Sequence, residues 1–106
     1  MVARGDIWLV NLDPTVGSEI RKSRPCVVVS PPEMHEHLRT VIVAPMTTKS
    51  WPAPFRIALS HGRQRGSILL DQVRAVDKAR LAKKLGMVSA KTLETTLNTL
   101  QEIFAN

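Results

Sequence analysis

Apolar residues in the first three-quarters of the chain occur in short runs, separated by proline, glycine and aspartate. Runs of this kind, rich in β-branched residues, are typical of strands. Apolar and polar positions alternate over 55–59, as expected for a strand with one buried face. Pro31 and Pro45 are expected to end strands, since proline cannot donate to the ladder. The pattern predicts five strands, over residues 7–12, 26–30, 41–44, 55–59 and 67–76.

The spacing of apolar positions changes after the last predicted strand. Asp77 is a suitable N-cap for a short helix that carries Leu81 and Leu85 on one side, and Gly86 suits its C-terminal end. Ser89 is a suitable N-cap for a second, longer helix. The apolar stripe of that helix comprises Leu93, Leu97, Leu100 and Phe104.

Closely spaced short strands followed by a helix predict a mainly β, α+β fold. The expected architecture is a small antiparallel barrel with a C-terminal helix packed on it. The chain has 106 residues, so residues 1–106 are expected to form a single domain. Folds of this kind host many functions, and the function has to be inferred from the loops.

Several features predict a cytoplasmic protein without membrane association. No stretch approaches the ~18 uninterrupted apolar residues of a membrane span. The N-terminal apolar run is too short for a secretory signal. The single cysteine, Cys26, lies in an apolar run and is expected to be a buried thiol outside any disulfide or metal cage.

The chain carries 15 Lys and Arg residues against 9 Asp and Glu residues, a net charge of +6. A basic bias of this size in one domain favours a polyanionic partner such as a nucleic acid. A solvated basic surface that maintains solubility is the alternative interpretation.

The segment 13–24 contains the densest cluster of polar residues. One carboxylate lies among several cations, a combination that could hold a phosphate group and move a proton. Gly17 gives the backbone the freedom to approach a ligand closely. A plain mobile hairpin loop is the alternative. The polar residues of the cluster are Ser18, Glu19, Arg21, Lys22, Ser23 and Arg24.

A second cluster, over 45–51, directly follows an apolar predicted strand. Thr47 and Thr48 could donate to a phosphoryl oxygen or serve ordinary turn chemistry, and Lys49 adds positive charge. Trp51 could stack on a base or cover the end of the barrel.

Asp71 and Gln72 lie inside the predicted strand 67–76. An unpaired buried carboxylate is costly, so Asp71 is expected either to face solvent or to pair with an arginine.

The three histidines, His35, His37 and His61, are expected to be surface residues, with an acid–base pair as the alternative. The histidines are scattered along the chain and there is one cysteine, so these residues do not have the spacing of metal ligands. No metal and no cofactor are therefore predicted.

Five short blocks, in this order and spacing, resemble the MazF/PemK/Kid family of toxins from type II toxin–antitoxin systems. The resemblance covers nearly the whole chain. The blocks are Arg4–Trp8 (RGDIW), Leu12–Glu19 (LDPTVGSE), Arg24-Pro25, Pro45–Thr48 (PMTT) and Leu70–Arg74 (LDQVR).

The resemblance implies an SH3-like barrel of the MazF/PemK/CcdB toxin fold that forms a two-fold homodimer. It implies a metal-independent endoribonuclease of the mRNA interferase type, which cleaves single-stranded RNA within a short motif. It also implies a cognate antitoxin, whose acidic, disordered segment is expected to lie against the basic loop 13–24.

The resemblance makes Arg24 and Thr47 the catalytic pair, with Glu19 beside them. Without a metal, the RNA's own 2′-hydroxyl is the expected nucleophile, giving a 2′,3′-cyclic phosphate and a 5′-hydroxyl. Arg24 stays protonated and is expected to stabilise the phosphorane, Thr47 to donate to a second oxygen and Glu19 to accept the proton. The expected RNA-binding residues are Ser18, Arg21, Lys22, Thr48, Lys49, Trp51, Asp71 and Gln72.

Two departures separate this sequence from the Kid-type relatives. Leu69 stands where those relatives place a catalytic arginine, and Ser18 where they have a histidine. The chain therefore resembles the subgroup that relies on Arg24 and Thr47, and Asp71 is assigned to positioning or reading RNA. A gyrase-targeting toxin of the same fold and a non-cleaving nucleic-acid-binding barrel are the alternatives. The arginine and threonine blocks are not expected in the first, and the second does not explain the Glu19–Arg24–Thr47 combination.

Overall fold

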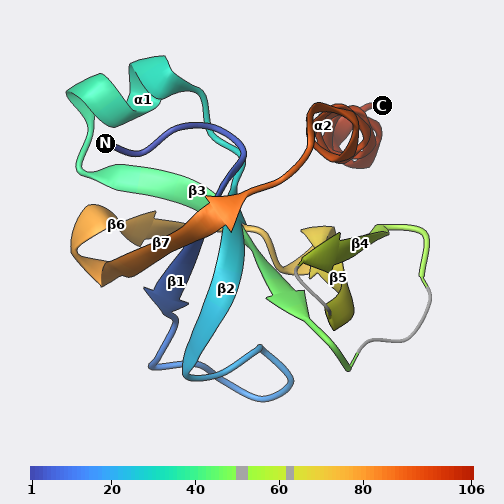
Figure 1. The fold of residues 1–106 in the computed structure, drawn as a ribbon, viewed down its shortest axis with the longest axis horizontal. Coiled ribbons are helices and arrows are strands. Elements are labelled where there is room, and N and C mark those ends of the chain that lie inside the picture. The colour runs from blue at the N-terminus through green and yellow to red at the C-terminus, as the bar shows by residue number, and fades with distance from the viewer. Residues whose placement is uncertain (50–52, 62–63) are drawn as a thin grey trace.

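The computed structural model describes residues 1–49, 53–61 and 64–106. Strands dominate this part of the chain, and one long helix follows them near the C-terminus (Figure 1). The elements, in order, are β1 (Asp6–Asn11), β2 (Ser23–Val28), α1 (Pro32–His37), β3 (Thr40–Thr47), β4 (Arg56–His61), β5 (Gln64–Leu69), the 3₁₀ turn η1 (Leu70–Gln72), β6 (Arg74–Asp77), the 3₁₀ turn η2 (Lys78–Arg80), β7 (Leu81–Met87) and α2 (Ala90–Phe104).

The seven strands form one antiparallel sheet in the order β4-β5-β3-β2-β1-β7, with β6 also paired to β3. The central strand, β3, pairs with β2 on one edge and with β6 on the other, because Val43 lies opposite both Val28 and Arg74. The sheet is not closed within the described residues, since β4 and β7 each pair along one edge. The predicted mainly β fold with a C-terminal helix is confirmed.

Two apolar clusters fill opposite faces of β2 and β3. Along β2, Cys26 and Val28 belong to one cluster and Val27 to the other, as the alternation of a strand requires. Burial on both faces explains why this strand is a continuous apolar run. Cys26 is fully buried, as predicted, and desolvation raises the pKa of its thiol to about 12.

The C-terminal helix α2 begins where the sequence predicts. The hydroxyl of Ser89 accepts a hydrogen bond from the amide of Thr92 at 3.1 Å, which caps the first turn. Leu97, Leu100 and Ile103 pack against the apolar cluster that contains Val27. The predicted stripe is wrong at its last position, because Phe104 is 75% exposed and Ile103 packs instead.

The short helix predicted after Asp77 is wrong. The carboxylate of Asp77 does cap a turn, accepting from the amide of Ala79 at 2.8 Å, but that turn is only η2. The chain then extends as β7, in which Gly86 lies opposite Ile7 of β1. Pairing with β1 overrides the helical spacing of Leu81 and Leu85, a tertiary effect that the local pattern does not contain.

The predicted strand 67–76 is interrupted. Its two ends, β5 and β6, both pair with β3, but the three residues of η1 leave the ladder between them. Asp71 and Gln72 therefore lie on a turn and not within a strand.

Pro45 also does not end β3, which continues to Thr47. Pro45 falls between the stretch of β3 paired with β6 and the stretch paired with β5.

The helix α1 was not predicted, and it buries His35, which the sequence placed on the surface. His35 Nε2 lies 2.6 Å from Ser30 Oγ, and its Nδ1 lies 3.3 Å from the carbonyl oxygen of Val2. The prediction holds for His37, which is exposed, while the side chain of His61 lies outside the described part. No helix among the described residues is long and apolar enough to cross a membrane.

Candidate active site

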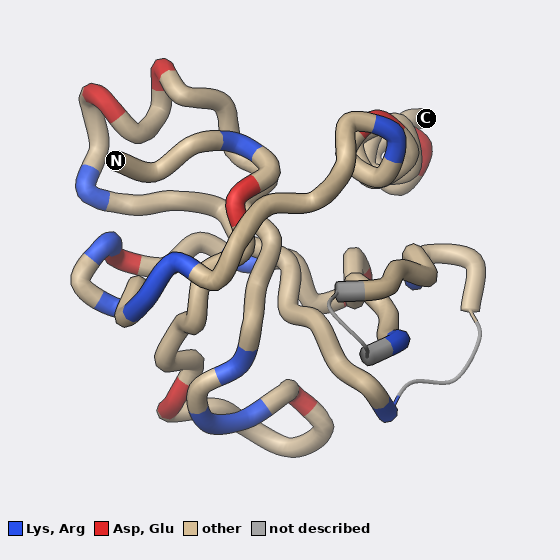
Figure 2. Tube along the Cα trace, viewed as in Figure 1, with Lys and Arg blue, Asp and Glu red and all other residues tan. Residues whose placement is uncertain are grey.

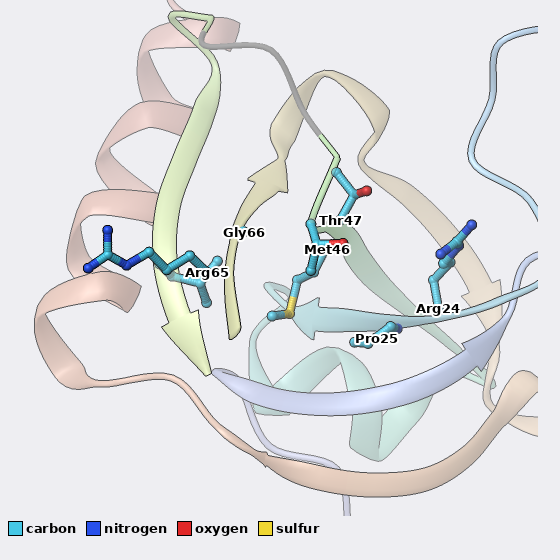
Figure 3. Close-up of a pocket in the computed structure, with 8 residues that line it drawn as sticks. Arg24, Pro25, Met46, Thr47, Arg65 and Gly66 are labelled. Carbon is cyan, nitrogen blue, oxygen red and sulfur yellow. The ribbon is translucent and has the colours of Figure 1, made fainter. Parts of the chain in front are cut away.

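Arg24 and Thr47 line one pocket of about 170 Å³. The two residues meet because β2 and β3 are antiparallel neighbours, so that the start of β2 lies beside the end of β3. Figure 3 shows both side chains at this junction. The complete lining is Arg24, Pro25, Met46, Thr47, Thr48, Leu59, Arg65 and Gly66.

The hydrogen bonds of the pair leave donors for a ligand. The hydroxyl oxygen of Thr47 accepts from the amide of Lys49 at 3.1 Å, so its own hydrogen is left to donate. Nε of Arg24 donates to the carbonyl oxygen of Arg21 at 3.2 Å. This contact fixes the guanidinium at one nitrogen and leaves the two Nη groups for a bidentate contact with an anion. The pair is suited to hold a phosphate group.

Sequence reasoning missed the far wall of this pocket. Arg65 and Gly66 come from β5, and Leu59 from β4. The Arg65 side chain points away from Arg24 (Figure 3). The sequence held no signal for this wall, because it depends on the pairing of Ser67 with Thr47 between β5 and the last residues of β3.

Glu19, the third predicted catalytic residue, lies outside that pocket. It lines a second pocket of about 420 Å³, where its Oε1 accepts from the amide of Val16 at 2.6 Å. Pro45 lines the second pocket while Met46 and Thr47 line the first, so the two pockets flank the end of β3. The second pocket is lined by Leu12, Pro14, Glu19, Ile20, Pro45, Asp71, Gln72, Val73 and Arg74.

Asp71 pairs with an arginine, one of the two outcomes expected for it. Its carboxylate accepts from Nε and Nη2 of Arg56 at 3.2 and 3.1 Å, and this hydrogen bonding raises the pKa of Arg56. The neighbouring Gln72 accepts from the amide of Ile20 at 2.8 Å. An amide oxygen must face that N–H, so the side-chain nitrogen of Gln72 remains for a ligand.

The loop that carries Glu19 is held at its base. Lys22 has a φ of 64°, unusual for a residue other than glycine, and its amide donates to Asp13 Oδ1 at 3.0 Å. Arg80 of η2 donates to the carbonyl oxygens of Asn11 and Asp13. These contacts fix the point at which the loop enters β2, immediately before Arg24.

Cationic positions gather where this loop enters β2, and a further group lies along β7 (Figure 2). The predicted contact residues of the loop are exposed, as are those that follow Thr47. Trp51 lies outside the described residues. The exposed residues of this set are Ser18, Arg21, Lys22, Thr48 and Lys49. In the described part of the chain, no group of three His, Cys, Asp or Glu residues could hold a metal ion.

The chain is similar to one family over nearly its whole length. Residues 3–104 match the PemK-like, MazF-like toxins of type II toxin–antitoxin systems. Endoribonuclease PemK of Escherichia coli is 36% identical over 106 residues, covering 94% of this chain and 80% of the relative. Endoribonuclease toxin MazF of Escherichia coli K12 is 38% identical over 91 residues, covering 85% of this chain and 82% of the relative.

Solved structures show the same fold. The crystal structure of MazF from Deinococcus radiodurans matches with a TM-score of 0.85 at 26% identity, covering 96% of this chain and 94% of that one. A crystal structure of MazE-MazF from the same organism matches with a TM-score of 0.73 at 25% identity, covering 97% and 94% of the two chains.

Proposed function

This chain belongs to the PemK-like, MazF-like family of toxins from type II toxin–antitoxin systems, and we propose that it is an endoribonuclease that cleaves single-stranded RNA at the Arg24–Thr47 pocket. The observation that carries the proposal is the convergence of a guanidinium and a donating hydroxyl from two strands on one pocket. The relatives named endoribonucleases, at 36% and 38% identity, support the same activity. The substrate is messenger RNA in the cytoplasm.

In this proposal the two Nη groups of Arg24 contact the scissile phosphate, and Thr47 donates to a second phosphoryl oxygen. Both contacts strengthen as negative charge develops on the non-bridging oxygens of the pentacoordinate phosphorane, so they lower the barrier more than they tighten substrate binding. Arg24 is not the base, because a guanidinium stays protonated at any ordinary pH.

The nucleophile is the RNA's own 2′-hydroxyl. A bond forms between the 2′-oxygen and phosphorus, the bond from phosphorus to the 5′-oxygen breaks, and the 5′-oxygen takes up a proton from solvent. The products are a 2′,3′-cyclic phosphate and a 5′-hydroxyl, and no metal takes part. We assign acceptance of the 2′ proton to Glu19. Since Glu19 faces the second pocket, the assignment requires the loop to bring it across the end of β3 when RNA binds.

RNA contacts extend from the catalytic pair into both pockets. Arg21, Lys22 and Lys49 neutralise phosphates, while Ser18 and Thr48 donate to the backbone of the RNA. Asp71 and Gln72 read base edges in the second pocket, and Trp51 stacks on a base. Neutralisation by lysine and arginine predicts that RNA affinity falls steeply with salt.

The proposed partners are a second copy of the chain, in a two-fold homodimer, and a cognate antitoxin. The antitoxin contributes an acidic, disordered segment that orders against the basic loop 13–24. The MazE-MazF structure from Deinococcus radiodurans supports the existence of such a complex. An affinity for an acidic peptide that does not change with salt contradicts this electrostatic interaction.

The test is incubation of the purified protein with single-stranded RNA in excess chelator. The wild type is expected to cleave, and Arg24→Ala to lose a hundredfold or more, about the effect of removing one charge-stabilising donor. Arg39→Ala is the matched control, since Arg39 is exposed and precedes β3 at the end opposite Thr47. Glu19→Gln tests the base separately.

Each alternative function gives a different outcome. Tight RNA binding without cleavage indicates a non-cleaving nucleic-acid-binding barrel. Growth arrest without either binding or cleavage indicates a toxin with a protein target such as gyrase. Cleavage by Arg24→Ala at the wild-type rate places the activity elsewhere and contradicts the proposal.

A further inference from the structure

Gly66 brings β5 unusually close to the end of β3. A Cβ atom added at Gly66 would lie 2.5 Å from the carbonyl oxygen of Thr47, 3.2 Å from its carbonyl carbon and 3.6 Å from Cα of Thr48. Real Cβ atoms essentially never approach another heavy atom to less than 3.0 Å. Any other residue at position 66 therefore requires one of the two strands to move.

The requirement for glycine is one of space and not of backbone conformation. Among the glycines that the structure describes, positive φ values occur at Gly5, Gly17 and Gly86, and not at Gly66. The atoms that a methyl group would meet belong to the backbone of Thr47 and Thr48, so no flexible side chain could turn away. Relief of the contact has to displace the backbone itself.

The backbone on the β3 side of this contact is that of the proposed catalytic threonine. β2 holds β3 through residues 43–45, whereas β5 holds it through 46–47. A shift of β5 is therefore transmitted first to Thr47, while Arg24, on β2, keeps its place. The distance between the guanidinium and the hydroxyl is then set by how closely β5 approaches β3.

We infer that Gly66 is a positioning residue, whose missing side chain lets β5 hold Thr47 at the correct distance from Arg24 for phosphodiester cleavage. The inference rests on the proposed function, because it assigns Gly66 a role in that same pocket. Gly66 itself lines the pocket but carries no group that takes part in the chemistry.

The test compares Gly66→Ala with the wild type in RNA cleavage. A displacement of about 1 Å at a catalytic group is expected to lower kcat by roughly a hundredfold. KM is expected to stay within about twofold, because Arg21 and Lys22, the RNA-binding cations of the loop before β2, do not move. Ser60→Ala is the control, since Ser60 is exposed in the same hairpin, opposite Arg65. A kcat of Gly66→Ala equal to that of the wild type overturns the inference.

A second measurement does not depend on activity. The methyl resonance of Thr47 is expected to shift in Gly66→Ala, whereas that of Thr99, on α2, stays in place. If the Thr47 resonance shifts in the variant but the wild type does not cleave RNA, the proposed function is rejected. The conclusion that Gly66 positions Thr47 then still stands. An unmoved Thr47 resonance in a folded variant overturns the inference.

If Gly66→Ala does not fold, the backbone mobility of Thr47 in the wild type tests the inference. A residue clamped by the neighbouring backbone is expected to have a backbone order parameter near that of rigid structure, about 0.85. A value for Thr47 below about 0.6 shows a mobile residue and overturns the inference.

Discussion

The carboxylate of Asp13 accepts a hydrogen bond from the main-chain amide of Lys22, at 3.0 Å. This contact joins the two ends of the loop that precedes Arg24. Leu12 reinforces it, since its amide donates to the carbonyl oxygen of Lys22 at 3.0 Å. The direction in which the chain enters β2 is therefore set at the base of the loop and not at its exposed tip.

Two replacements of Asp13 distinguish the loss of its hydrogen-bond acceptor from the loss of its negative charge. Asp13→Ala removes the oxygen that accepts from Lys22 and is expected to lower the free energy of unfolding by about 1 kcal/mol. Asp13→Asn keeps an acceptor oxygen and is expected to lose less. Urea unfolding measures the difference. Equal losses in the two variants would falsify the assignment of this contact to the base of the loop.

Lys22 adopts a φ of 64°, a conformation that is costly for any residue with a side chain. Lys22→Gly and Lys22→Ala remove the same charge, so the comparison isolates the backbone. Lys22→Gly is expected to be more stable than Lys22→Ala by about 0.5–1 kcal/mol, because glycine adopts positive φ without steric cost. The larger entropy that glycine loses on folding offsets part of this gain. Thermal unfolding of the two variants provides the measurement, and a more stable alanine variant contradicts the account.

The buried His35 predicts a difference between two neighbouring histidines. His35→Ala removes the ring that contacts the Ser30 hydroxyl and the carbonyl of Val2, leaving Ser30 with the amide of Ile42 alone, and is expected to destabilise the fold by about 1–3 kcal/mol. His37→Ala, an exposed position on the same helix, is the control and is expected to change stability by less than about 0.5 kcal/mol. Similar losses in both variants contradict the role given to His35.

Most elements with strong local signals were predictable, and two of the errors share one cause. The strand ending in Asn11 and the helix capped by Ser89 lie within one or two residues of their predicted bounds. The segments 70–72 and 78–87 were assigned wrongly because their structure depends on distant partners. η1 breaks the ladder along β3, and β1 draws 81–87 into the sheet.

The candidate site also combines features that local sequence predicts with features that depend on the fold. The sequence identified Arg24 and Thr47 as residue types suited to phosphate chemistry, and the antiparallel pairing of β2 and β3 places them in one pocket. Glu19 lies close to Arg24 in the sequence but faces another pocket, because the loop folds back and its carboxylate caps the amide of Val16. Proximity along a loop does not determine which side of a strand a residue reaches.

The thiol of Cys26 gives a prediction about pH. Burial raises its pKa from 9.0 to about 12 in the folded protein, whereas the unfolded chain releases the proton near the ordinary value. The folded state therefore holds a proton that the unfolded state loses between these values, so its stability falls as pH rises from 9 to 12. Cys26→Ala is expected to reduce this dependence, and an unchanged slope in urea unfolding contradicts the assignment.

The central claim is that the Arg24–Thr47 pocket directs the RNA's own 2′-hydroxyl against the neighbouring phosphate. The most direct test uses two oligonucleotides that differ only at the cleaved position, one with ribose and one with 2′-deoxyribose, both in excess chelator. Cleavage of the ribose oligonucleotide alone, leaving a 2′,3′-cyclic phosphate and a 5′-hydroxyl, is the predicted result. Cleavage of the deoxyribose oligonucleotide, or ends carrying a 5′-phosphate, would show that another nucleophile acts and would contradict the claim.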